Sequence, residues 1–115
     1  MIPLPTVNRI LLYREPIDMR KSFDGLAAVA LKQLGENPLS GTLFVFFNQN
    51  RTIVKLLFWD LGGYAIIAKR LEKGTFQIPR NSAPKMSVSS TELQLILEGI
   101  NLGSIRYRNR YKPQL

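Results

Sequence analysis

The sequence predicts an α+β fold, in which an antiparallel β-meander of about four to five strands packs with one long N-terminal helix and one short C-terminal helix. Three observations support this class. Apolar residues recur at helical spacing between 23 and 34, strand-forming segments separated by turn residues follow between 42 and 78, and a helix-capping motif begins at Ser89. The chain has 115 residues, 45% of them hydrophobic, which suffices for one domain with its own core. We therefore assign residues 1–102 to a single domain and 103–115 to a basic tail.

The N-terminal part is expected to form one strand and one helix. The segment 9–14 (RILLYR) is a short apolar run that Pro16 ends, which favours a strand. Asp18 then has the residue type of a helix N-cap, and Gly35 stands where a C′ glycine is favoured. We therefore predict a helix over 19–34, whose apolar stripe is Phe23, Leu26, Ala27, Ala30, Leu31 and Leu34.

The middle of the chain alternates strand-forming segments with turns. We predict strands over 42–47, 52–59, 64–72 and 75–78, joined by turns at 48–51, 60–63 and 73–74. The next segment, 79–88, contains two prolines and no periodicity, which predicts a loop. Ser89 and Glu92 then form a capping box that begins a short helix ending near Gly99.

The turn lengths sort the strand residues onto two faces of the meander, because residues directly opposite each other share a face. One face is almost entirely apolar, and the helix over 19–34 is expected to cover it: Leu43, Val45, Phe47, Val54, Leu56, Phe58, Ala65, Ile67, Leu71, Phe76 and Ile78. The second face carries aromatic residues, with Lys55 and Arg70 near its middle: Phe44, Phe46, Ile53, Leu57, Trp59, Tyr64, Ile66 and Ala68. Two interpretations of this second face remain open. Either another element or a partner subunit covers it, or it is partly open and stacks single-stranded bases on its rings.

The composition restricts the classes of function. Sixteen Lys and Arg against eight Asp and Glu give a net charge of +8, which favours a polyanionic partner, nucleic acid before an anionic membrane surface. The chain has no cysteine and no histidine, which excludes disulfides, Cys/His zinc sites and a Ser-His triad. No segment approaches the roughly 18 apolar residues of a membrane span, so we expect a soluble, cytoplasmic protein without a membrane partner.

Catalytic chemistry is not expected from the acidic residues. A metal-dependent nuclease or transposase needs two or three converging carboxylates. Here Asp18 and Glu92 have capping roles, Asp60 lies in a turn, and Asp24 lies close to Arg20 in the sequence. We therefore predict a protein that is not an enzyme and that has no catalytic residues, metal ion or cofactor.

The candidate ligand contacts are cations and aromatic rings. A basic helix start at Arg20 and Lys21 could hold a phosphate, although a solvated first turn with local ion pairs is the favoured explanation. If the tail 106–112 (RYRNRYK) is extended, its cations lie on one side and could contact phosphates without sequence specificity. The alternative is a solvated chain end with no ligand. The nucleic-acid contacts we predict are Arg20, Lys21, Arg51, Lys55, Lys69, Arg70, Arg106, Arg108, Arg110 and Lys112, and the rings predicted to stack or to meet a partner are Phe44, Phe46, Trp59 and Tyr64.

Four segments of the chain resemble one known family. They are DMRKSFDGLAA at 18–28, NPLSGTLFVFFNQNRTIVKLLFWD at 37–60, AKRLEKGTF at 68–76 and LQLILEGI at 93–100. Together they resemble TnpB, the second-open-reading-frame accessory protein family of the bacterial insertion-sequence-66 elements. The resemblance implies an accessory factor of transposition, encoded beside a separate DDE-type transposase that carries the catalytic acids. Where that family often has a Gly- or Arg-rich hairpin, this chain has one cation, Arg51, which implies a weaker contact at this tip.

These inferences give two functional hypotheses. The first is a non-catalytic accessory factor of DNA transposition that binds nucleic acid, DNA in the first place, through its basic surface. The alternative is a protein–protein adaptor that docks on the transposase or another transposon-encoded protein through the second face of the sheet. An uncovered apolar face would also favour a homodimer.

Overall fold

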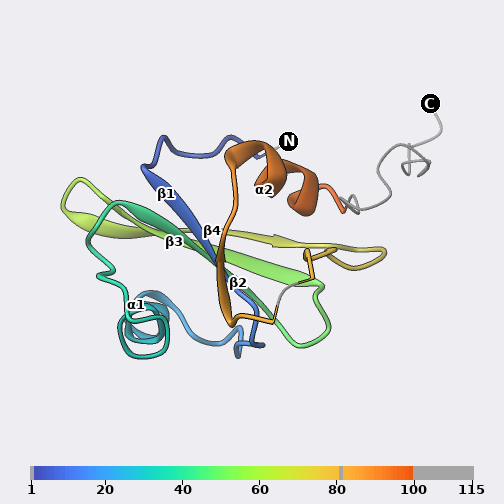
Figure 1. The fold of residues 1–115 in the computed structure, drawn as a ribbon, viewed down its shortest axis with the longest axis horizontal. Helices are drawn as coiled ribbons and strands as arrows, with labels where there is room; N and C mark the ends of the chain where they lie inside the picture. Colours follow the sequence, from blue (N-terminus) through green and yellow to red (C-terminus); the bar gives the residue numbers. More distant parts are fainter. Residues whose placement is uncertain (1, 81, 100–115) are drawn as a thin grey trace.

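A computed structural model describes residues 2–80 and 82–99 of the chain. In this part the elements are β1 (Arg9–Tyr13), α1 (Phe23–Lys32), β2 (Thr42–Phe47), β3 (Ile53–Asp60), β4 (Gly63–Arg70), β5 (Lys85–Ser87) and α2 (Ser90–Leu97). The strands form one five-stranded sheet in the order β4-β3-β2-β1-β5. Helix α1 lies against one face of the sheet and α2 against the other (Figure 1). The predicted α+β class is confirmed.

The sheet is a meander only from β2 to β4. Those strands pair antiparallel through two turns, as predicted, but β1 pairs parallel with β2. A parallel neighbour needs a crossover, and α1 supplies it between the two strands. β5 then pairs antiparallel with the other side of β1. The first strand therefore lies inside the sheet, between elements that are distant in the sequence.

The first helix is shorter than the predicted 19–34. α1 has 10 residues and begins after Ser22, whose side chain makes no capping hydrogen bond. Asp18 is not the N-cap, because its carboxylate accepts hydrogen bonds from the backbone N–H of Arg20 at 2.9 Å and from the Arg20 guanidinium. Aspartate competes with the helical backbone in this way by closing a local turn. The residues before α1 thus form a separate turn, in which the N–H of Lys21 donates to the carbonyl of Asp18.

Two other predictions about the second half of the chain are corrected. The segment 75–78 is not a strand, because the N–H of Phe76 donates to the carbonyl of Arg51 at 2.7 Å and the Phe76 ring turns into the core, 5.7 Å from the ring of Phe47. The segment 79–88 is not entirely a loop, since it contains β5. The capping box at Ser89 is confirmed, with both of its reciprocal hydrogen bonds present.

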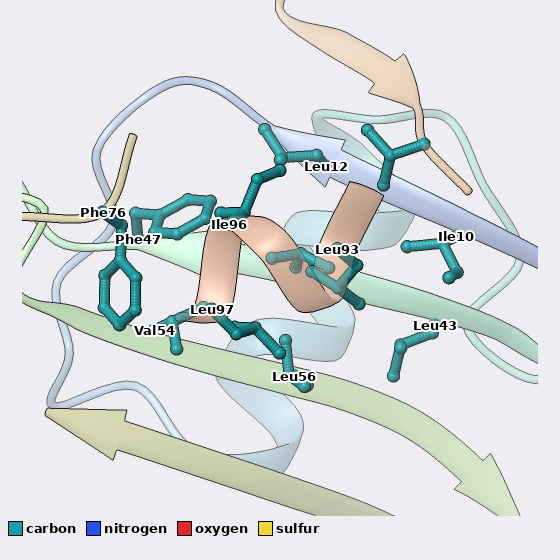
Figure 2. Packing of buried hydrophobic residues seen from close by; sticks show 12 residues of the cluster. Ile10, Leu12, Leu43, Phe47, Val54, Leu56, Phe76, Leu93, Ile96 and Leu97 are labelled. Carbon is teal, nitrogen blue, oxygen red and sulfur yellow. The ribbon is translucent and has the colours of Figure 1, made fainter. Parts of the chain in front are cut away.

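The sheet separates two hydrophobic cores. The core on the α2 side joins Leu93, Ile96 and Leu97 of the helix to the sheet and to Phe76, as Figure 2 shows. The core on the α1 side joins Leu26 and Ala30, among others, to the second face of the sheet. The predicted division of the strands into two faces is confirmed, but the predicted cover is exchanged. The almost entirely apolar face meets α2 instead of α1, and the aromatic face meets α1.

No helix within the described residues has the length and apolar content needed to cross a membrane. The predicted tail contacts, from Arg106 to Lys112, lie outside the described residues.

Candidate nucleic-acid interface

A groove opens at the end of the α1 face where the chain enters the helix. One wall is the segment 16–19, the other is the tip of the β2–β3 hairpin at 48–50, and Ile53 at the start of β3 completes the lining. Its volume is about 520 Å³. The N–H of Ile17 donates to the carbonyl of Phe47 at 2.9 Å, which joins the first wall to the end of β2. The groove is therefore built on the rigid sheet rather than on two independent loops.

Lys55 holds the segment before α1 against the sheet. It lies on β3, on the face that α1 covers, and its Nζ donates to the carbonyls of Met19 at 2.7 Å and Lys21 at 2.9 Å. A lysine ammonium has three donors, and two of them are used here. We therefore assign Lys55 a positioning role: it fixes the backbone that presents Arg20 and Lys21.

The hairpin tip on the other side of the groove is fixed by Asn48. Its Oδ1 accepts the N–H groups of Thr52 and Ile53 at 2.9 and 3.0 Å, and its Nδ2 donates to the Thr52 hydroxyl. Arg51 adopts a left-handed conformation with a φ of 56°. Such a φ is uncommon for a residue with a side chain. Here the turn enforces it, because the Arg51 N–H donates to the Asn48 carbonyl and the Arg51 carbonyl accepts from the core segment at Phe76.

Cations from three segments neighbour the residues that line this groove, and we call Arg20, Lys21, Arg51 and Arg70 the basic rim. Arg20 and Lys21 directly follow one wall, Arg51 directly follows the other, and Arg70 lies opposite Ile53 in the β3–β4 pairing. Among the described residues, the side chains of Lys21 and Arg51 have no hydrogen-bond or ion-pair partner.

The other two cations of the basic rim form only exposed ion pairs. Arg20 pairs with Asp18 at 2.6 Å, with 91% and 45% of the two side chains exposed, and this pair lowers the pKa of Asp18 to about 2. Arg70 pairs with Glu72 at 3.2 Å, again with both side chains mostly exposed. Exposed pairs of this kind contribute little to stability. A phosphate group can therefore replace the carboxylate at little cost.

Several predicted ligand residues lie elsewhere. Lys69 lies on the α2 side, where its Nζ donates to the carbonyl of Leu97 at 2.7 Å and so caps the C-terminal end of α2. Phe44 and Phe46 are completely buried beneath α1, which corrects the interpretation of that face as an open stacking surface. Burial leaves those two rings no accessible side on which a base could stack.

Trp59 and Tyr64, the remaining predicted rings, lie at the β3–β4 turn. They are opposite each other in the register, and their ring centroids are 5.1 Å apart at an interplanar angle of 82°. Both rings are half-buried, and Tyr64 packs against the core on the α1 side. This edge-to-face pair stabilises the turn, as aromatic pairs across strands commonly do. It lies at the opposite end of β3 from the basic rim.

Sequence reasoning missed an ion-pair cluster at the other end of α1. Glu36 accepts from Arg9 of β1 and from Lys85 of β5, whose Nζ is 2.6 Å away, and the same Nζ donates to the carbonyl of Leu34. The hydrogen bond from Lys85, followed by the contribution of Arg9, lowers the pKa of Glu36. The three side chains come from positions 9, 36 and 85, so no local motif marks them. Their role is to tie the end of α1 to the sheet.

A second groove, of about 570 Å³, lies between the N-terminal arm and the start of α2. Residues 4–10 line one side, and Val88 to Thr91 with Gln94 line the other. The Nε2 of Gln94 donates to the carbonyl of Ile2, whereas its buried Oε1 has no partner among the described residues. This groove carries no concentration of cations and is chemically distinct from the first.

Within the described residues, no group of three or more acidic side chains is arranged to hold a metal ion. The described side chains at this groove are exposed cations beside a backbone that hydrogen bonds hold in place. Nothing in its geometry supplies a nucleophile beside a base.

Comparison with known proteins places this geometry in context. A family model described as "IS66 Orf2 like protein" matches residues 8–107. The chain is similar to the uncharacterized protein y4hO of Sinorhizobium fredii (strain NBRC 101917 / NGR234), with 32% identity over 101 residues that cover 88% of each chain. It is also similar to the uncharacterized protein y4jC of the same organism, with 27% identity over 105 residues, 91% of this chain and 90% of that protein. No solved structure matches the chain.

Proposed function

Because the chain belongs to the IS66 Orf2-like family of transposition-associated accessory proteins, we propose that it is a non-catalytic factor that binds DNA through the basic rim, in the cytoplasm where the mobile element resides. The observation that carries this proposal is the convergence of Arg20, Lys21, Arg51 and Arg70 from three segments around one groove. The net charge of +8 supports it, since a surplus of this size attracts a polyanion before contact is made.

The chemistry of the basic rim fits phosphate recognition rather than base reading. Two of its cations have no protein partner in the described residues, and the other two face only exposed carboxylates. Phosphate contacts fix where a protein sits on nucleic acid but carry no sequence information by themselves. We therefore expect the described surface to bind duplexes of different sequence with similar affinity.

The experiment is a fluorescence-anisotropy titration with a labelled duplex of the element's terminal repeat. A scrambled duplex and the matching single strand compete, and the salt concentration is varied. If about 4–6 phosphates are neutralised, the plot of log affinity against log salt has a slope of about −3.5 to −5.5. An affinity that does not change with salt, or no binding below about 100 µM at low salt, would refute the proposal.

Matched variants then test the location of the site. Lys21→Gln combined with Arg51→Gln removes the two unpartnered cations of the basic rim, which should make the slope less steep by about 1.8. The control is Lys32→Gln, an exposed charge in the last turn of α1 that lies outside the basic rim. Equal losses in the double variant and in the control would place DNA elsewhere on the chain.

A second candidate function is a protein adaptor that docks on the transposase or another transposon-encoded protein. Helix α1 covers the second face of the sheet, on which the sequence predicts this docking. The groove beside α2 offers another surface, where the Oε1 of Gln94 has no partner among the described residues. The adaptor hypothesis requires co-purification with transposase at about 1 M salt after nuclease treatment. Thr91→Arg in the groove should abolish it, whereas Ser87→Arg on β5 should not.

A further inference from the structure

The two edges of the sheet differ in length and in chemistry. One edge is β5, which has three residues, begins with Lys85 and directly follows Pro84. A short strand with a lysine and a flanking proline is a protected edge. The other edge is β4, with eight residues. In the part of the chain that the structure describes, only β3 pairs with β4, so the backbone groups on its outer side have no strand partner.

The exposed edge of β4 is apolar over most of its length. From Tyr64 to Ala68 it contains no charge and no proline, and its cations, Lys69 and Arg70, stand together at its end. The side chains along the strand are half-buried or exposed even though they belong to a sheet with two cores. A long apolar edge of this kind is a template for pairing with another strand.

We propose that two copies of this chain associate through β4, which pairs antiparallel with β4 of the second copy around a two-fold axis perpendicular to the sheet. The proposal concerns the assembly of the protein and does not depend on the DNA-binding function. The two-fold axis keeps the α1 faces of both copies on one side of a continuous sheet. The association extends the backbone hydrogen bonding of β4 to both of its edges.

The register follows from the faces of the strand. Tyr64, Ile66 and Ala68 lie on the α1 side, and Ala65, Ile67 and Lys69 lie on the α2 side. Directly opposed residues share a face, so an even-numbered residue must oppose an even-numbered one. Centring the axis on Ile67 pairs all of the residues from 64 to 70. Ile66 then opposes the small Ala68, Ala65 opposes Lys69, and Tyr64 opposes Arg70.

Sizes and charges favour a second copy as the occupant. In this register each bulky Ile66 meets an alanine, and each Arg70 meets a tyrosine ring, which attracts a cation. The antiparallel arrangement also separates the two cationic ends, whereas a parallel one would place Lys69 beside Lys69. The assembly closes at two copies, because the remaining outer edges are the two short β5 strands. An edge that is self-complementary in this way needs no other partner.

The experiment is sedimentation equilibrium of the full chain at about 0.5 M salt, where bound nucleic acid is displaced and repulsion between two copies of charge +8 is screened. We expect twice the 13.1 kDa mass of one chain, with a dissociation constant of about 10 µM or lower. A protein that remains monomeric at about 200 µM overturns the proposal.

Two substitutions at Ala65, which introduce charges of opposite sign, test the register. Ala65→Lys places one new lysine opposite Lys69 at each of the two symmetric positions, and should raise the dissociation constant at least about tenfold. Ala65→Glu creates opposite charges in the same places and should leave the constant unchanged or lower it. Ser87→Lys adds the same charge to β5 and should change nothing. If Ala65→Lys dimerises as the unmodified chain does, β4 is not the interface.

Hydrogen exchange provides a measurement that needs no variant. If β4 pairs with a second copy, amides on the outer side of β4 should exchange more slowly at high protein concentration than at low concentration. Amides of β5 should show no such difference, because its outer edge stays open. If the protein sediments as a dimer while the exchange in β4 stays independent of protein concentration, the interface lies elsewhere. That result overturns the proposal.

Discussion

Replacing Lys55 by methionine should destabilise the protein, although the sequence alone marks this lysine as a phosphate contact. Its Nζ donates to two backbone carbonyls, those of Met19 and Lys21, at 2.7 and 2.9 Å. Methionine keeps an unbranched apolar stem that ends where the Cε of lysine would be, with sulfur in place of Cδ, and it lacks the ammonium group. The variant therefore isolates the two hydrogen bonds.

The size of the effect follows from the exposure of each bond. A hydrogen bond made by a charged group contributes about 1.5–3 kcal/mol when it is shielded from water. The bond to Met19 is partly buried, whereas the bond to Lys21 is exposed and water can replace it. We therefore expect a loss of about 1.5–2 kcal/mol in the free energy of unfolding, nearly all of it from the first bond.

The assay is urea unfolding monitored by circular dichroism, and the control is Lys21→Met. Lys21 is exposed and its side chain has no partner in the described residues, so the control should change stability by less than about 0.5 kcal/mol. The Lys55→Met variant should also exchange its Lys21 amide faster, because the turn that Asp18 closes is then less tightly held. A loss below about 0.5 kcal/mol would refute the positioning role of Lys55.

Three further predictions concern single side chains. Because Lys85 lowers the pKa of Glu36, that carboxylate contributes stability above its unfolded-state pKa and loses it as the pH falls through the lower, folded-state pKa. Glu36→Gln should therefore lower stability in urea at pH 7 and remove this part of the acid dependence. Asp18→Asn should strengthen DNA binding in anisotropy titrations, since it releases Arg20; with the pKa of Asp18 near 2, the gain should be constant from about pH 5 to 8. Phe76→Ala should cost about 3–5 kcal/mol in urea unfolding, because only 1% of Phe76 is exposed, and a cost below about 1 kcal/mol would contradict its place in the core.

The two faces of the sheet could be predicted because an error of two residues in the strand register leaves every side chain on the same face. The predicted four-residue turn at 48–51 would place Phe47 opposite Thr52, whereas the structure pairs Phe47 with Val54. A shift of two residues leaves every side chain on its face, whereas a shift of one would have exchanged them. The second hairpin agrees directly, with Trp59 opposite Tyr64.

The helix that covers each face could not be predicted from the pattern. Both helices have an apolar stripe, and a stripe does not say which sheet face it meets. The choice depends on β1, which enters the sheet parallel to β2 and so sends α1 across one face as a crossover. β5 was missed for a related reason. Its three residues are too few for their alternation to distinguish a strand from a loop, and it forms because β1 offers a free edge.

The roles of the charged residues at the candidate site could not be predicted from the sequence pattern either. Sequence reasoning identified the cations, but not which of them the fold uses internally. Lys55 and Lys69 belong to neighbouring strands and differ in no obvious way, yet one fixes the turn before α1 and the other caps α2. Only the three-dimensional distances separate these two lysines from Lys21 and Arg51, whose side chains have no hydrogen-bond or ion-pair partner in the described part of the chain.

These internal lysines also explain how a basic surface stays rigid without an acidic framework. Lys55 binds two carbonyls of the turn before α1, and Lys69 binds a carbonyl at the C-terminal end of α2, where the helix dipole favours a cation. Neither lysine pairs with a carboxylate among the described residues. The chain therefore keeps its positive surplus while the cations themselves hold the backbone in place. Asp18 and Glu72 differ from Glu36, which ties the end of α1 to the sheet, because their ion pairs are exposed and contribute little to stability. If the chain binds DNA as proposed, a surface held in this way is already ordered in the free protein, so binding does not have to include the entropy cost of ordering it.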